Sequence, residues 1–312
     1  MYKYKSEKFG DFLKYTFFDT QTNNSFSVVP EHGACVLEVE IDGQSIVDGH
    51  ENVEEMLNDK WFKSTILFPF PNRLKKGSYS FEGKTYQFPI NEPATNNALH
   101  GFANNPIFTI ENINCDADFA EIHCRCQNKG MDPAYPFAFS FEVKLKISNP
   151  GSFEIEFLFK NEDSQKIPVG LGWHPYFNCF DDLDQASLQC PDCQYIDIDE
   201  FAIPNKERFD YSYFKKMRKI RNAVLDNAFE LAPKESRAEV VLQSDRGKLI
   251  YWQDTGLNKF NYLQIFTPSH RKSIAIEPMT CNIDAFNNGD GLIVLKPGDQ
   301  CTMKCGFSFS TT

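Results

Sequence analysis

Two histidines and one glutamate stand in short segments that are otherwise apolar or rich in turn residues. The segments are Leu99–Phe102 (LHGF) around His100, Gly172–Phe177 (GWHPYF) around His174, and Ile274–Thr280 (IAIEPMT) around Glu277. An imidazole with a pKa of about 6.5 and a carboxylate with a pKa of about 4.3 are the usual groups for proton transfer at neutral pH. These residues therefore predict general acid–base chemistry.

The local settings suggest how the chain would present these groups. Glu277 closes an alternating strand and precedes Pro278, which cannot continue a hydrogen-bonded ladder, so the strand is expected to end near the carboxylate at the sheet rim. His100 is followed by Gly101, which gives the backbone freedom to place the ring. Each group also has an ordinary alternative: Glu277 could be a structural ion-pair partner, His174 a packed histidine, and His100 a loop residue satisfied locally.

The elements that must position these residues are predicted to be β-strands. Residues 141–147 and 153–159 alternate with period two and flank the turn signal Ser-Asn-Pro-Gly at 148–151, which predicts an antiparallel hairpin with one wet face. Further candidate strands are residues 34–41, 119–125, 238–243, 248–252, 261–266, 273–277 and 303–309, and residues 53–58 form one short helix candidate. Many strands separated by turns indicate an all-β sandwich or barrel.

Composition limits the partners. The 312 residues carry 32 basic and 43 acidic side chains, a formal net charge of -11. This balance argues against nucleic acid or an anionic membrane as a partner and suits a neutral ligand. No apolar run approaches the roughly 20 residues of a membrane span, and no apolar segment follows the first charged residues, so we expect a cytoplasmic protein.

The ten cysteines are expected to be reduced thiols. Cys190 and Cys193 have the spacing of a CxxC motif, but a zinc site would need two more ligands at comparable spacing. We read this pair as two thiols that flank a turn, and we expect no metal and no cofactor.

The three segments resemble those of the aldose 1-epimerase (galactose mutarotase) family. The resemblance covers roughly residues 25–309 and includes further segments in the family's order: residues 71–74 (PNRL), 77–86, 135–137 (YPF), 225–229 (LDNAF), and 284–287 (DAFN) with 295–298 (LKPG). It implies that residues 1–312 form one domain, a single large antiparallel β-sandwich with a sugar cleft across a sheet.

The resemblance also implies roles. Glu277 would take the proton from the anomeric hydroxyl, His174 would protonate the ring oxygen, and His100 would hydrogen-bond the substrate near that oxygen. Arg73, with five fixed donors, and Asp226, a bidentate acceptor, would bind sugar hydroxyls; otherwise each is a surface charge. With ordinary pKa values, Glu277 would set the acidic limb of the pH profile and His174 the alkaline limb.

The chain departs from the best-known galactose mutarotases after the glutamate. In those enzymes a Gln lies two residues after the catalytic glutamate, and an acidic residue followed by alanine lies slightly closer to that glutamate than here. In this chain Pro278-Met279-Thr280 follow Glu277, and the acidic residue and alanine are Asp284-Ala285. This indicates a divergent branch. Two alternatives to a hexose mutarotase are therefore a hexose 6-phosphate mutarotase, with Arg73, Lys75 and Lys76 binding the phosphate, and a non-catalytic carbohydrate-binding sandwich. The other histidines, His32, His50, His123 and His270, are read as structural or surface residues.

Overall fold

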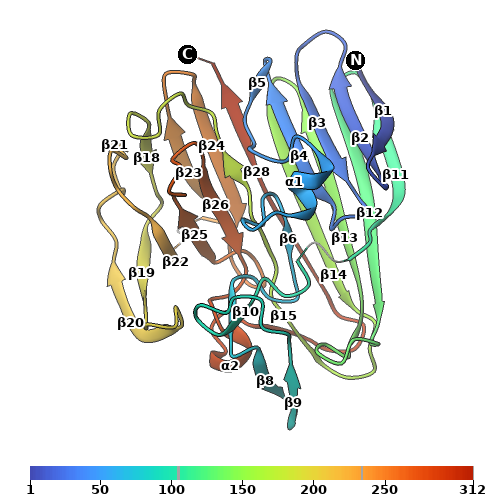
Figure 1. Cartoon of the computed structure of the whole chain (residues 1–312), viewed down its shortest axis with the longest axis vertical. Helices are drawn as coiled ribbons and strands as arrows, with labels where there is room; N and C mark the ends of the chain where they lie inside the picture. The colour runs from blue at the N-terminus through green and yellow to red at the C-terminus, as the bar shows by residue number, and fades with distance from the viewer. Residues whose placement is uncertain (104–105, 233–234, 312) are drawn as a thin grey trace.

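The computed structural model describes residues 1–103, 106–232 and 235–311. The chain folds almost entirely into antiparallel strands, which pack as a β-sandwich (Figure 1). This confirms the predicted fold class.

The largest sheet has nine strands, and its middle is built from long strands with regular alternation. Its order is β11 (Thr109–Cys115), β12 (Phe119–Lys129), β13 (Ala138–Ser148), β14 (Ser152–Asn161), β28 (Gln300–Ser310), β24 (Lys248–Asp254), β23 (Arg237–Gln243), β18 (Ser187–Gln189) and β21 (Arg218–Lys219). The predicted hairpin is β13–β14, with Ser148 opposite Ser152. Along β13, Val143 and Leu145 are buried while Glu142 and Lys144 are partly exposed, as the period-two pattern requires.

A second sheet of eight strands carries Asp226 and Glu277, and His174 lies in the link between two of its strands. Its order is β20 (Pro204–Asp210), β19 (Cys193–Ile198), β22 (Asp226–Leu231), β25 (Tyr262–Phe266), β26 (Ile274–Met279), β16 (Gly172–Trp173) and β6 (Ile66–Leu67), and β17 (Tyr176–Phe177) pairs with β26. Two different short strands, β16 and β17, therefore flank one side of β26.

Smaller sheets and two short helices complete the described chain. A five-stranded sheet joins β1 (Tyr2–Phe9), β2 (Phe12–Asp19), β3 (Ser25–Val29), β4 (Cys35–Ile41) and β5 (Gln44–Ser45); β7 (Arg73–Lys75) pairs with β10 (Asn97–Leu99), β8 (Ser78–Phe81) with β9 (Lys84–Gln87), and β15 (Ile167–Val169) with β27 (Ile293–Leu295). The helices are α1 (Val53–Leu57), at the predicted place, and α2 (Ala285–Asn288). The side chain of Asn52 caps α1 by accepting from the amide of Glu55.

The end of β26 corrects one expectation. Each predicted strand coincides with an observed one, but β26 runs past Glu277 and through Pro278 to Met279. The proline is tolerated because β26 changes partner there: Ala275 pairs with Tyr176 of β17, and Met279 pairs with Gly172 of β16. Glu277 therefore lies inside a strand and not at its end.

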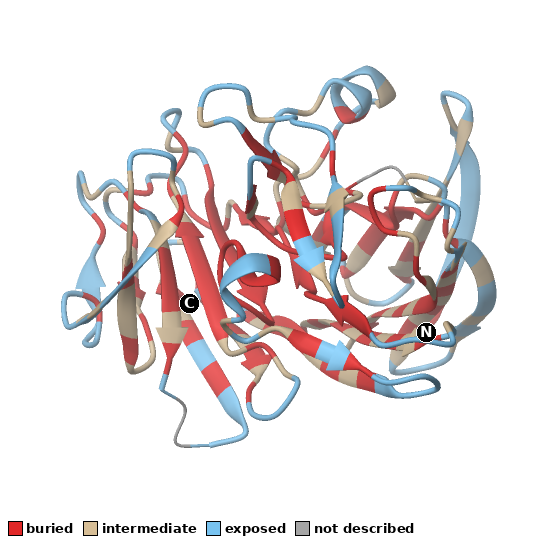
Figure 2. Ribbon diagram, turned by 90° about the horizontal axis from the view of Figure 1, so that it is seen from below, coloured by how far each residue is buried: buried red, intermediate tan, exposed pale blue. Residues whose placement is uncertain are grey.

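The core lies between the sheets and is rich in phenylalanine. One cluster of buried side chains includes Phe26, Phe153, Phe157 and Ile276, from the five-, nine- and eight-stranded sheets. The rings of Phe26 and Phe153 meet edge to face at 5.3 Å. Figure 2 shows the strands mostly red, with exposed segments concentrated in the connecting loops. Burying each such side chain contributes roughly 1.5–3 kcal/mol, so this cluster gives the rigid frame on which the site is built.

Candidate active site

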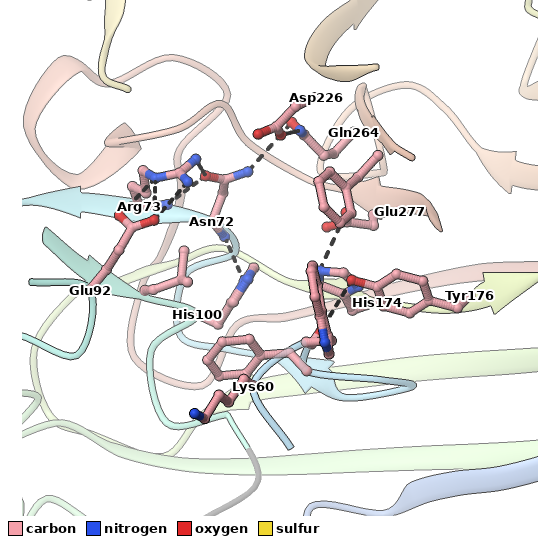
Figure 3. A pocket seen from close by; sticks show the side chains of 14 residues that line it. Lys60, Asn72, Arg73, Glu92, His100, His174, Tyr176, Asp226, Gln264 and Glu277 are labelled. Atoms are coloured by element: carbon pink, nitrogen blue, oxygen red, sulfur yellow. Dashed lines mark hydrogen bonds and ion pairs between the residues drawn. The ribbon is translucent and has the colours of Figure 1, made fainter. Parts of the chain in front are cut away.

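The five predicted site residues line one pocket of about 220 Å³ (Figure 3). Glu277 comes from β26 and Asp226 from the start of β22, while His174 lies in the link between β16 and β17. Arg73 begins β7, and His100 follows β10, the strand that pairs with β7. The pocket thus joins the eight-stranded sheet to the small β7–β10 sheet.

Glu277 is almost fully buried, with 1% of its surface exposed. Its Oε1 lies 3.4 Å from Nε2 of His174, and its Oε2 has no hydrogen-bond partner among the described residues. Burial raises the pKa of Glu277 well above its usual value, the charge of Asp226 raises it further, and Arg73 opposes the shift. A carboxyl group in this setting holds a proton more readily than an exposed one.

His174 is fixed through its backbone and its ring. Its amide donates to the carbonyl of Thr65 (3.0 Å), its carbonyl accepts from the amide of Ser64 (2.9 Å), and its ring stacks on Tyr176 at 5.0 Å. Burial lowers the pKa of His174 to about 3. The pKa values of His174 and Glu277 therefore shift in opposite directions, and each shift favours the uncharged form of the group.

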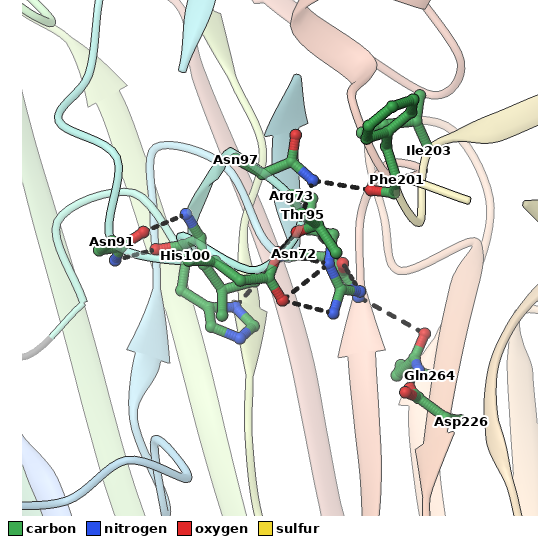
Figure 4. Close-up of polar contacts among 12 residues, drawn as sticks. Asn72, Arg73, Asn91, Thr95, Asn97, His100, Phe201, Ile203, Asp226 and Gln264 are labelled. Atoms are coloured by element: carbon green, nitrogen blue, oxygen red, sulfur yellow. Dashed lines mark hydrogen bonds and ion pairs between the residues drawn. The ribbon is translucent and has the colours of Figure 1, made fainter. Parts of the chain in front are cut away.

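His100 is oriented by a reciprocal contact with Asn72 (Figure 4). The amide of His100 donates to the carbonyl of Asn72 (2.8 Å), and the amide of Asn72 donates to Nδ1 of His100 (3.1 Å). Burial, together with the charges of His174 and Arg73, lowers the pKa of His100. A neutral ring that accepts at Nδ1 carries its proton on Nε2, so His100 can only donate through Nε2.

Arg73 is held by a carboxylate that the sequence did not suggest. Its Nε and Nη2 donate to Glu92 at 2.7–3.1 Å, and its Nη1 donates to Oδ1 of Asn72 at 3.3 Å. This bidentate pair fixes the plane of the guanidinium and offsets its charge.

A chain of amides connects Asp226 to the same region. Gln264 Nε2 donates to Oδ1 of Asp226 (2.9 Å), and Asn72 Nδ2 lies 3.5 Å from Oε1 of Gln264. The β25–β26 register places Gln264 directly opposite Glu277. Burial raises the pKa of Asp226, and Arg73 partly offsets this. Glu92, Arg73, Asn72, Gln264 and Asp226 are therefore joined in one hydrogen-bonded set of side chains along the pocket.

Aromatic rings also line the pocket. Trp61, Phe62, Tyr176 and Phe266 all line the pocket. Trp61 is 40% exposed and stacks on Phe266 at 5.8 Å, whereas Phe62 meets the ring of His100 edge to face at 4.7 Å. A pocket lined by both polar groups and aromatic rings suits a ligand with hydroxyl groups and C–H surfaces.

Sequence reasoning missed Asn72, Glu92 and Gln264. A signal existed for two of them, because Asn72 lies inside the PNRL segment and Gln264 is a polar residue in the apolar run Tyr-Leu-Gln-Ile-Phe. No pattern in the sequence marked Glu92.

Other predicted features lie outside the pocket. Lys75 and Lys76 are exposed and do not line it. Cys190 and Cys193 are buried free thiols, and burial raises the pKa of Cys193 to about 12. Within residues 1–103, 106–232 and 235–311 no group of three or more potential ligands could hold a metal ion. None of the helices in this described part is both long and apolar enough to cross a membrane.

Comparison with known proteins identifies the family of the chain. The family model for aldose 1-epimerase matches residues 18–308. An uncharacterized protein, YihR of Escherichia coli K12, is 26% identical over 275 residues, which cover 85% of this chain and 84% of that protein.

Two solved structures share the fold. A galactose mutarotase-like protein from Clostridium acetobutylicum has a TM-score of 0.87 at 21% identity, and galactose 1-epimerase from Lactobacillus acidophilus has a TM-score of 0.82 at 16% identity. Each comparison covers 100% of this chain and 99% of the other. With the family model matching nearly its whole length, the chain belongs to the aldose 1-epimerase family.

Proposed function

We propose that this protein is an aldose mutarotase that interconverts the α and β anomers of a free, neutral hexose. The observation that carries the proposal is the contact between His174 and Glu277, a buried acid–base pair 3.4 Å apart in a pocket with aromatic and hydroxyl-binding walls.

The reaction needs two proton transfers. Glu277 takes the proton of the anomeric hydroxyl while His174 delivers one to the ring oxygen, which opens the ring to the aldehyde. After rotation about the C1–C2 bond both transfers reverse, and the ring closes on the other face. The carboxylate–imidazolium form that starts this cycle holds the same number of protons as the neutral pair. Its formation moves a proton from Glu277 to His174 against both pKa shifts, so sugar binding has to favour the charged form of the pair.

The remaining polar groups bind the sugar. His100 donates through Nε2 to the ring-oxygen side of the sugar, because Nδ1 is occupied by the amide of Asn72. Arg73 and Asp226 bind hydroxyl groups of the sugar. Glu92 holds the side chain of Arg73 in place, and Gln264 holds that of Asp226.

The pocket favours a neutral sugar over a phosphorylated one. Arg73 is already paired with Glu92, while Lys75 and Lys76 lie outside the pocket. Glu92 and Asp226 also line the cavity and would repel a phosphate, against the attraction of Lys60, which lines the cavity as well. A purely binding module has no need of a buried acid–base pair, which is costly to bury.

The test is polarimetry on freshly dissolved α-glucose, α-galactose and a hexose 6-phosphate. Replacing Glu277 by Gln keeps the shape but removes the base, so kcat should fall by about two to four orders of magnitude. Hexose affinity, measured by ligand-observed NMR, should change much less, because the lost interaction acts in the transition state.

The chain offers a matched control. Glu142 contacts His123 at 2.9 Å on the β12–β13 surface, outside the pocket, so Glu142→Gln removes a Glu–His pair without touching the site. Wild-type protein that binds hexoses but accelerates none, or a folded Glu277→Gln protein as fast as Glu142→Gln, would show that the mechanism is wrong.

A further inference from the structure

A loop of residues 59–65 crosses one side of the pocket. Lys60, Trp61 and Phe62 from this loop line the cavity. Phe62 and Ser64 have φ angles of 53° and 56°, in the left-handed region that side chains rarely adopt. A backbone held in such a conformation depends on contacts that fix it.

Asp59 supplies these contacts at the start of the loop. Its Oδ1 accepts from the amide of Trp61 (2.8 Å) and its Oδ2 from the amide of Lys63 (2.7 Å). Behind it, Nε2 of His50 lies 3.6 Å from Oδ2, and both side chains are buried, at 0% and 4% exposure. Neither ring nitrogen of His50 has a hydrogen-bond partner in the described chain, so His50 packs against Asp59 without competing for its two backbone contacts.

The rest of the loop contacts both histidines of the site. Tyr176, whose ring stacks on His174, donates its hydroxyl to the carbonyl of Trp61 (3.0 Å). Phe62 lies against His100. The amide of Ser64 donates to the carbonyl of His174. The position of the loop therefore sets the aromatic wall and braces the acid–base groups.

We propose that Asp59 is a positioning residue for sugar recognition: its carboxylate fixes the 59–65 loop, and the loop places Trp61 and Phe62 as the aromatic wall of the pocket. This inference rests on the proposed function only for the identity of the ligand, since the placement of Trp61 is measurable without a sugar.

Replacing Asp59 by Ala tests the proposal. The hexose KM and dissociation constant should rise by roughly tenfold, which corresponds to the loss of one hydrogen bond to a charged group. The value of kcat should change less, because Glu277 lies on β26 and His174 is held between β16 and β17. Iodide should quench Trp61 fluorescence more strongly, measured in a Trp252→Phe background because Trp173 is buried. Asp59→Asn, which keeps one acceptor, should fall between Asp59→Ala and wild type.

Asp116→Ala is the matched control. Asp116 also accepts from two backbone amides, those of Asp118 and Phe119, but it does not line the pocket. Quenching and KM in both Asp59 variants equal to those of Asp116→Ala would overturn the proposal. If no aldose is turned over, the proposed function fails on its own, and the quenching comparison still decides whether Asp59 positions the loop.

Discussion

At the scale of single residues, burial changes the roles that Glu277 and His174 can take in the pH profile. The residue types predict an acidic limb from Glu277 and an alkaline limb from His174. In the fold, burial raises the pKa of Glu277 and lowers that of His174, which reverses the expected order. The limbs then belong to the pair: activity is lost when the pair gains a second proton and when it gives up its last one.

We therefore expect a broad bell-shaped profile of kcat/KM against pH. The acidic limb should lie near the lowered pKa of His174, where both groups become protonated, and the alkaline limb at the raised pKa of Glu277, where both are deprotonated. Polarimetry over the pH range in which the protein stays folded measures both limbs. An acidic limb at about 4.3 together with an alkaline limb at about 6.5, the values of an exposed carboxylate and an ordinary imidazole, would contradict this expectation.

At the scale of elements, the segment 284–287 secures the strand that carries Arg73. The amide of Asp284 donates to the carbonyl of Arg73 (2.8 Å), and Oδ1 of Asp284 accepts from the amide of Lys75 (2.9 Å) and from the side chain of Asn287 (2.7 Å). Asp284 is buried. The family motif DAFN thus fixes β7 and contributes nothing directly to the pocket lining.

Replacing Asp284 by Ala should lower the free energy of unfolding by about 1–3 kcal/mol, because the amide of Lys75 loses its acceptor. KM should also rise, since β7 holds Arg73 less firmly. Thermal melting and polarimetry measure the two effects. Asp284→Asn retains an oxygen for the amide of Lys75 and should lose less stability; equal losses in the two variants would argue against this role.

Elements were predictable from the sequence where one face of a strand is buried and the other is wet. The β13–β14 hairpin shows this alternation, so its bounds and register were accessible. Strand β1 was missed because nearly all of its residues are exposed on both faces, which leaves no period-two pattern to detect. Gln264 was missed because its place in the site depends on the register of β25 against β26, which no local pattern encodes.

At the scale of the whole molecule, we infer a single domain. One cluster of buried side chains extends from Tyr2 to Phe309 and joins the sheets. Unfolding of one sheet would therefore expose the buried faces of the others. We expect one cooperative unfolding transition in which activity, tryptophan fluorescence and far-ultraviolet circular dichroism are lost together. A separate early transition in any of these signals would show that the chain contains independent units.

The connection between Asn72 and Gln264 has a further consequence, for the time at which the site forms. These two residues are 192 positions apart in the chain, and Glu277 follows Gln264. Contacts at such separations carry a high loop-closure entropy and tend to form late in folding. A chain emerging from the ribosome therefore lacks the acid–base pair until Glu277 has been added, because the first 250 residues carry both histidines and Arg73 but not the carboxylate that pairs with His174. Catalytic competence is a property that the chain acquires only near the end of its synthesis and folding.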